Sequence, residues 1–305
     1  MSAPHASDQP AISPVLGILI GIVAVSFASI FIRFASAGGA SGLAIAAWRL
    51  SLASLLLAVP AWFRVRDELA SLGRRDLALA LLSGTFLAGH FATWITSLEL
   101  TSVASSVALV TMYPLFAAVV STFLLGERPH SLAWAGVLLS VLGSVTVAFT
   151  DVSGGTGPAP LVGDALALAG AVTGAGYFLV GRTLRRKLSL IAYVTLTYGT
   201  AAVVLILVAL IARVQLIGFG PPVYLMLILL AVVPQLIGHS SFNWALRYLS
   251  ATFVTVTIVG EPLGATLLAF LVFGERPGWL KALGGLLILL GILLVSRAET
   301  MKPGD

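Results

Sequence analysis

The stretch Gly274-Glu275-Arg276-Pro277 closes a long apolar run near the C-terminal end of the chain. Three residues flank it at fixed distances, namely Pro262, Gly284 and Gly291. The same four-residue motif occurs earlier as Gly126-Glu127-Arg128-Pro129, with matching neighbours at Pro114, Gly136 and Gly143. Every matched pair is 148 residues apart (274 − 126). This spacing predicts a chain built from two related halves.

Composition places most of the chain out of contact with water. Of its 305 residues, 59% are hydrophobic and 10% are charged, and the mean hydropathy is +1.06. A soluble domain carries about 25% charged residues. The composition therefore predicts a membrane protein with many spans, whose immediate partner is the lipid bilayer.

Several classes of function are disfavoured by the residues that could carry them. The chain has no cysteine, and its four histidines stand too far apart in sequence to form a helical ligand pair, so we expect no metal site and no cofactor. The sequence contains no phosphate-binding G-x-x-x-x-G-K-[ST] motif, which argues against ATP hydrolysis. The net charge of +5 fits basic cytoplasmic loops, so nucleic acid is not an expected partner.

Apolar runs of about 17 to 25 residues can cross a bilayer as helices. Ten such runs are predicted: 15–35, 42–62, 76–97, 102–125, 131–149, 161–181, 190–212, 223–246, 251–273 and 279–296. The loops between them are too short for a soluble domain. We therefore expect an all-α polytopic membrane protein, divided into a tail (1–14), a first five-helix repeat (15–149), a second five-helix repeat (161–296) and a tail (297–305).

Basic residues predict the orientation. Twelve lysines and arginines fall on one side of the predicted spans and four on the other, with Arg49 inside a span. Since Lys and Arg collect in cytoplasmic loops, both termini are expected in the cytoplasm. An offset of 148 residues covers five spans, and an odd number inverts the second half. Inverted repeats of this kind bind substrate near the membrane midplane, where the halves meet.

The chain has ten predicted spans, a repeated Gly-Glu-Arg-Pro motif followed by glycines seven residues apart, and Trp48-Arg49 on the second span. In these features it resembles the EamA branch of the drug/metabolite transporter superfamily. The resemblance covers about 15–296. It implies a bacterial inner-membrane secondary transporter that exports amino acids or related small metabolites. We expect this transporter to act as a monomer and to work by alternating access. Within the branch the chain is similar to exporters of aromatic and neutral amino acids. Nucleotide-sugar-like and multidrug carriers of the same fold remain alternatives.

Two prolines predict bends at equivalent places in the halves. Pro114 would leave the carbonyl of Val110 without its helical partner, and Pro262 would do the same to Ile258. We expect each helix to kink near its middle. Two interpretations stay open, a pair of hinges for alternating access and a pair of static kinks that shape the packing.

Charged residues inside spans usually face the interior or a water-filled cavity. Glu261 and Arg49 are such residues, and either could bind one end of a zwitterion. Because the resemblance places an arginine on the second span whatever the cargo, a structural role is favoured for Arg49. Glu261 is a candidate substrate-binding residue, since its equivalent in the first half is Tyr113. That difference between the halves suits an asymmetric ligand or a proton-coupled step.

Two polar stripes mark the third and eighth spans as the best candidates to line a cavity. His90, Trp94 and Ser97 share one helix face. Gln235, His239 and Asn243 recur every four residues. We select as substrate-binding candidates His90, Trp94, His239 and Asn243 from these stripes. Each histidine is either a proton carrier, since its pKa lies near neutrality, or a hydrogen-bonded interior residue.

The remaining candidates are aromatic or structural. Tyr113 and Tyr177 lie deep in their spans and are expected to contact an apolar or aromatic part of the substrate. Glu127 and Glu275 stand at helix ends beside arginines and are expected to form local ion pairs or caps. Two G-x-x-x-G motifs, at 17–21 and at 170–174, predict close helix packing within the monomer.

Two other classes of membrane protein fit less well. An enzyme would need a histidine and a carboxylate grouped with a nucleophile or a metal, and His90, His239 and Glu261 are too few and too separated in sequence. A channel would show repeated rings of charge, which the apolar spans lack.

Overall fold

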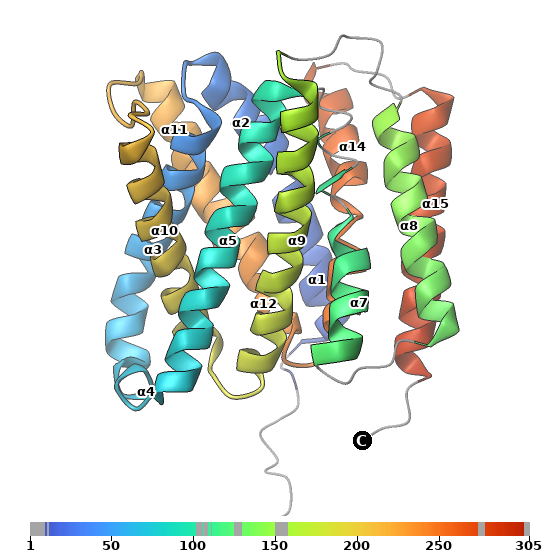
Figure 1. Cartoon of the computed structure of the whole chain (residues 1–305), viewed down its shortest axis with the longest axis horizontal. Coiled ribbons are helices and arrows are strands. Elements are labelled where there is room, and N and C mark those ends of the chain that lie inside the picture. Colours follow the sequence, from blue (N-terminus) through green and yellow to red (C-terminus); the bar gives the residue numbers. More distant parts are fainter. Residues whose placement is uncertain are drawn as a thin grey trace, which may run out of the picture.

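Figure 1 shows the computed structural model, which describes residues 10, 12–101, 106, 109–110, 112–124, 130–149, 158–273 and 278–301. Helices joined by short loops make up this part of the chain, without a strand. Seven of its helical stretches are long and apolar enough to cross a membrane: Pro14–Ala37, Gly42–Arg64, Arg74–Leu100, Pro160–Arg185, Leu190–Ile211, Pro221–Ala245 and Ala251–Val272. Two shorter apolar stretches, Ser131–Thr146 and Ala282–Ala298, accompany them. The predicted count of ten crossings stays a prediction.

The first half contains helices α1 (Pro14–Ser26), α2 (Ala28–Ala37), α3 (Gly42–Arg64), α4 (Arg66–Ala70), α5 (Arg74–Leu100), α7 (Tyr113–Leu124) and α8 (Ser131–Phe149). Proline at the first position of α1 suits a helix start, because its missing N–H would have no partner there. The start of α3 is capped by Ser41, whose hydroxyl accepts from the backbone N–H of Ala44.

The second half contains α9 (Pro160–Arg185), α10 (Leu190–Ile211), α11 (Pro221–Leu230), the π-helix η2 (Ala231–His239), α12 (Ser240–Ala245), α13 (Ala251–Ile258), α14 (Glu261–Phe273) and α15 (Trp279–Thr300). Serine caps begin α10 and α13, with Ser189 accepting from Ala192 and Ser250 from Phe253. The elements α11, η2 and α12 follow one another directly and together form one spanning stretch.

The two halves interlock. The first helix of the second half, α9, lies against α5, the third long helix of the first half, and α1 lies against η2 and α12. Glycines permit both contacts: a Cβ on Gly21 would meet the ring of Phe242 at 2.5 Å, and one on Gly174 would meet His90 at 2.8 Å. The predicted close helix packing at the two G-x-x-x-G motifs is confirmed.

Helices α8 and α15 pack side by side at one end of the bundle (Figure 1). A Cβ on Gly136 would lie 2.6 Å from the carbonyl oxygen of Gly291, and one on Gly143 would lie 2.6 Å from that of Gly284. As the residue number rises by seven on α8, its contact on α15 falls by seven. The two helices are therefore antiparallel, and their contact is made by the glycines that the repeat matches.

The prolines of the repeat stand at helix starts, which corrects the expectation of kinks within continuous helices. Pro114 is the second residue of α7, and Pro262 is the second residue of α14. In the second half the break lies at Val259 and Gly260, where tight turn bonds run to Val256 and Thr257. A proline in the first turn loses no helical bond, so the chain ends one helix and begins another.

Some predicted features lie outside the described residues. These are both copies of the Gly-Glu-Arg-Pro motif with Glu127 and Glu275, most of the first part of the predicted span 102–125, the side chain of Pro262, most of the tail 1–14, and residues 302–305.

Candidate functional site

A buried arginine lies at the centre of the bundle. Arg49 on α3 is 1% exposed, and its Nε donates to Oε1 of Gln235 on η2 across 2.8 Å. Its guanidinium carbon lies 4.4 Å from the ring centroid of Phe91 on α5, a cation–π contact. The charges of Arg49 and Glu261, the first residue of α14, also interact. In the described part of the chain, however, no ion pair joins these two side chains.

A chain of hydrogen bonds extends from Gln235 toward α9. The Tyr198 hydroxyl on α10 lies 3.5 Å from the backbone carbonyl of Gln235 and 3.2 Å from the hydroxyl of Ser240. Nδ2 of Asn243 donates to the hydroxyls of Tyr198 (3.2 Å) and Tyr177 (2.5 Å). Helices α3, α9, α10, α12 and η2 thus meet in one buried polar network.

The π-helix η2 explains how this network is positioned. Pro234 lacks an N–H, so the ordinary helical bonding cannot continue through it. The N–H of Ser240 instead bonds the carbonyl of Gln235, five residues earlier. Wide turns of this kind are rare and frequently occur at functional sites. Here the turn lies between the two residues of the polar stripe that face the network, Gln235 and Asn243.

Four polar atoms around this network are buried without a hydrogen-bond partner in the described structure. They are Nε2 of Gln235, Nδ1 of His239, Oδ1 of Asn243 and Nε1 of Trp94. A buried donor or acceptor left unpaired costs about 1–3 kcal/mol, and such groups in a native protein call for a water, an ion or a ligand. The arrangement can hold a small polar molecule.

Aromatic rings surround the polar atoms. The ring of His239 lies edge-on to Phe91, with centroids 5.4 Å apart, and 6.4 Å from that of Tyr177. His90 stacks on Trp94, with centroids 5.9 Å apart. Nδ1 of His90 lies 2.9 Å from the carbonyl oxygen of Gly170, and since a carbonyl only accepts, Nδ1 carries the hydrogen. His90 is thus a hydrogen-bonded interior residue.

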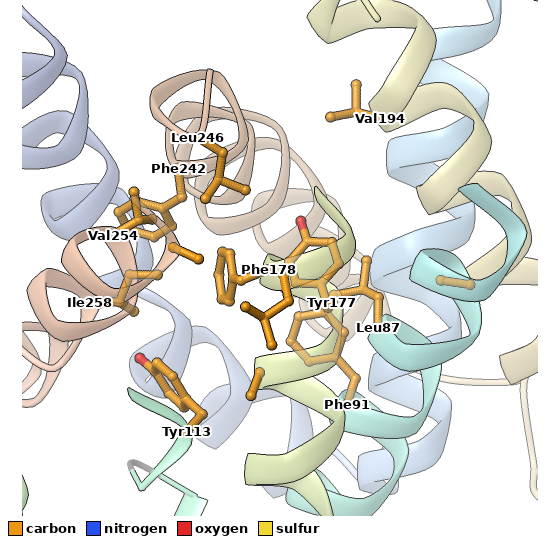
Figure 2. Packing of buried hydrophobic residues seen from close by; sticks show 14 of the residues in the cluster. Leu87, Phe91, Tyr113, Tyr177, Phe178, Val194, Phe242, Leu246, Val254 and Ile258 are labelled. Atoms are coloured by element: carbon orange, nitrogen blue, oxygen red, sulfur yellow. The ribbon is translucent and has the colours of Figure 1, made fainter. Parts of the chain in front are cut away.

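Tyr113 and Glu261 lie toward the other side of the cluster. Tyr113 is 7% exposed and lies across Phe178 from Tyr177, as Figure 2 shows. These two residues begin α7 and α14, at the matching positions of the two halves. The backbone carbonyl of Glu261 lies 3.5 Å from the hydroxyl of Ser26 on α1.

Two arginines near the end of α9 fix the far end of the network. Arg185 donates from Nε to the carbonyl of Asn243 (2.9 Å) and from Nη1 to the carbonyl of Leu188. Arg182 donates to the carbonyls of Leu246 (2.6 Å) and Arg247 (3.1 Å). The carbonyls of Asn243, Leu246 and Arg247 lie at the end of α12 or just after it, where backbone carbonyls lack helical partners. The arginines therefore hold the helix that carries the Asn243 side chain.

The structure brings together most of the residues that the sequence pointed to. Asn243 and Tyr177 belong to the hydrogen-bond network around Arg49, and His239 packs beside it against Phe91 and Tyr177. His90 and Trp94 flank the network, and Tyr113 and Glu261 lie beside it. Sequence patterns did not indicate three members: Phe91, Tyr198 and Ser240. Phe91 reads as an ordinary core residue, and Tyr198 lies on a helix that is apolar on all sides. The sequence indicated Gln235 only as a member of the polar stripe on the eighth span, and not as a binding residue.

A model of a protein family described as the EamA-like transporter family matches residues 12–149 and, a second time, residues 161–297. The chain belongs to the EamA-like transporter family. The expected resemblance is thereby confirmed, and the chain is a multi-pass membrane protein of a transporter family rather than an enzyme.

Known relatives carry transporter names. The chain is 28% identical over 298 residues to a probable terminal-alkyne amino-acid exporter of Streptantibioticus cattleyicolor, covering 93% of this chain and 96% of that protein. It is 26% identical to YdfC, an uncharacterised transporter of Bacillus subtilis, covering 79% of this chain and 76% of that protein. A solved crystal structure shares the fold, with a TM-score of 0.78, 18% identity and coverage of 95% of this chain and 99% of that chain.

Proposed function

We propose that this EamA-like transporter is a secondary carrier that exports neutral or aromatic amino acids, or related small metabolites, across the bacterial inner membrane. Substrate would bind in the buried cluster around Arg49, Tyr177, His239 and Asn243, and cross by alternating access. The relative named as an amino-acid exporter supports the substrate class.

The observation that carries this proposal is the group of unpartnered buried polar atoms on Gln235, His239, Asn243 and Trp94. Both halves contribute to it, since Trp94 lies on α5 and the other three residues lie on η2 and α12. Carriers built from two repeats bind their substrates where the repeats meet. Polar groups that are costly to bury there fit a site completed by the substrate.

The antiparallel pairing of α8 and α15 supports the proposed arrangement of ten membrane helices in two inverted halves. These are the matching last helices of the two repeats, and they run in opposite directions. With five spans in each half and the basic residues on one side, both termini lie in the cytoplasm in this proposal. A reporter that is active only outside the cytoplasm, fused at Lys302, should stay inactive, and strong activity would overturn the orientation.

The helix breaks before α7 and α14 support a role for Pro114 and Pro262 as hinges. In the second half the break separates α13 from α14 within one apolar stretch, so the two parts can tilt with little loss of backbone bonding. The breaks also place Tyr113 and Glu261 at the first position of the moving helices. Substrate contact and helix movement would then be coupled at these two residues.

Transport in proteoliposomes tests the proposal. The purified protein should take up labelled threonine, methionine or tryptophan, with saturable rates. Tyr177→Phe removes a hydroxyl that bonds Asn243 and should reduce uptake. The matched control is Tyr224→Phe, whose hydroxyl accepts from the N–H of Gly218 in an exposed loop; it should leave uptake unchanged.

Each negative outcome has its own meaning. Absence of uptake for all three amino acids would overturn the substrate class, and uptake of nucleotide sugars or drugs instead would favour the other carriers of this fold. Equal uptake by Tyr177→Phe and wild type would remove the cluster as the binding site.

A further inference from the structure

We infer that Arg49 and Gln235 form a subsite that binds the carboxylate of the transported molecule, rather than Arg49 serving the structure alone. This inference rests on the proposed function, and it names the chemical group that the central cluster recognises. It also assigns Gln235 a direct role in binding.

The hydrogen bond between the two residues fixes the orientation of the glutamine. Nε of Arg49 carries a hydrogen and can only donate. The atom of Gln235 that faces it, 2.8 Å away, is therefore the amide oxygen. The amide nitrogen Nε2 then points elsewhere, and it is buried without an acceptor in the described structure. Gln235 itself is fully buried. The pair thus presents an unused donor beside a fixed positive charge.

Among the described residues, no carboxylate forms an ion pair with the charge of Arg49. A buried charge is costly unless it is paired and hydrogen-bonded. Arg49 has the face of Phe91 and the oxygen of Gln235, both of which are neutral. The carboxylate that interacts with it electrostatically, Glu261, forms no ion pair with it among the described residues. An anion that binds directly to the guanidinium would satisfy what the fold leaves open.

A carboxylate matches this set of donors. It only accepts hydrogen bonds, through two oxygens, and the planar guanidinium can bind both. The amide nitrogen of Gln235 supplies a further donor. The ring of Phe91 lies against Arg49, and the ring of His239 lies within contact distance of those of Phe91 and Tyr177. A molecule bound by its carboxylate would therefore place its remaining part among aromatic side chains.

When Glu261 is ionised, it competes with a substrate carboxylate for the positive charge of Arg49, because both groups are negative. Among the described residues, the titratable groups that act on Glu261 are Arg49 on α3 and Tyr113 on α7. Of the helices packed against α14, α1 carries no titratable residue and α2 carries Arg33. Neutralising Glu261 should therefore strengthen carboxylate binding, whereas adding a negative charge at Gln235 should weaken it. Changes at Glu261 and at Gln235 are therefore expected to shift the affinity for a carboxylate in opposite directions.

Binding to purified wild type and variants in detergent tests the inference, with threonine, methionine and tryptophan each compared with its carboxamide. Gln235→Glu keeps an oxygen facing Arg49 and places a carboxylate in the anion position. It should weaken binding of the amino acid about tenfold or more, the effect of losing a hydrogen bond to a charged group, and abolish the preference over the amide. Glu261→Gln should strengthen amino-acid binding. The matched control Gln215→Glu, in an exposed loop, should change neither.

The outcomes separate the inference from the function on which it rests. If wild type binds the amino acids and their amides equally well, or if Gln235→Glu keeps the wild-type preference, the carboxylate subsite is overturned and the carrier function stands. If wild type binds none of these six compounds, the proposed substrate class fails, and the subsite fails with it. Arg49→Lys provides a check on geometry, since it keeps the charge and loses the planar fork; unchanged affinity would also contradict the inference.

Discussion

Replacing Gly143 by alanine should separate α8 from α15. The added Cβ would lie 2.6 Å from the carbonyl oxygen of Gly284 and 2.7 Å from the backbone nitrogen of Ile288. Ordinary contacts begin at 3.4 Å, so the first is too short by 0.8 Å (3.4 − 2.6). Both neighbours are backbone atoms of a helix and cannot rotate away, which forces the whole of α15 to move.

The expected cost is about 1–3 kcal/mol, the usual range for overpacking of a tight interface. A matched substitution should have the opposite sign. Gly199→Ala on α10 would place its Cβ 3.4 Å from the Ser54 hydroxyl, an ordinary contact, so the gain in helix propensity of up to about 1 kcal/mol should remain.

Thermal unfolding of the two variants in the same detergent measures the difference. A change of 1 kcal/mol shifts the Tm of a chain this large by roughly 2–4 °C, so Gly143→Ala should melt several degrees below wild type and Gly199→Ala at or slightly above it. Gly136→Ala should resemble Gly143→Ala, and the double variant should lose less than the sum, since the first change already separates the helices. An unchanged or raised Tm for Gly143→Ala would refute the close backbone contact.

Three further predictions concern the network and the helix breaks. Asn243→Ala leaves two buried tyrosine hydroxyls without their shared donor and should lower the stability by about 1–3 kcal/mol, seen as a lower Tm. Arg185→Gln shortens a buried side chain that bonds two carbonyls and should cost about 2 kcal/mol; the exposed Arg186→Gln serves as control and should melt like wild type. Pro262→Ala should slow transport while leaving substrate affinity unchanged if the break acts as a hinge, and an unchanged transport rate would remove that role.

Periodicity predicted the positions of the helices because crossing a bilayer constrains both their length and their polarity. The predicted run 42–62 corresponds to α3 and the run 190–212 to α10, with ends that differ by two residues or fewer. The stripe that contains His239 and Asn243 indicated a buried polar face for the same reason, since polar groups inside a membrane must turn toward protein. These features are properties of single helices.

Features that depend on how helices meet could not be predicted in this way. The stripe on the eighth span did not show that Gln235 would face Arg49, because the rotation of one helix against another is fixed by packing. Pro234 could have produced either a kink or the π-helix that forms. Pro262 was expected to bend a helix, but Gly260 nearby lets the chain stop and restart.

The contact between α8 and α15 has the form of a twofold-symmetric interface. Gly136 meets Gly291, and their repeat partners Gly284 and Gly143 meet in the same way. Such an interface is isologous, because each side supplies the same residues, and it can therefore be made by two copies of one sequence. A separate protein with the glycines of α8 would have the surface needed to dimerise with an inverted copy of itself, and in the present protein a single chain supplies both sides of this interface.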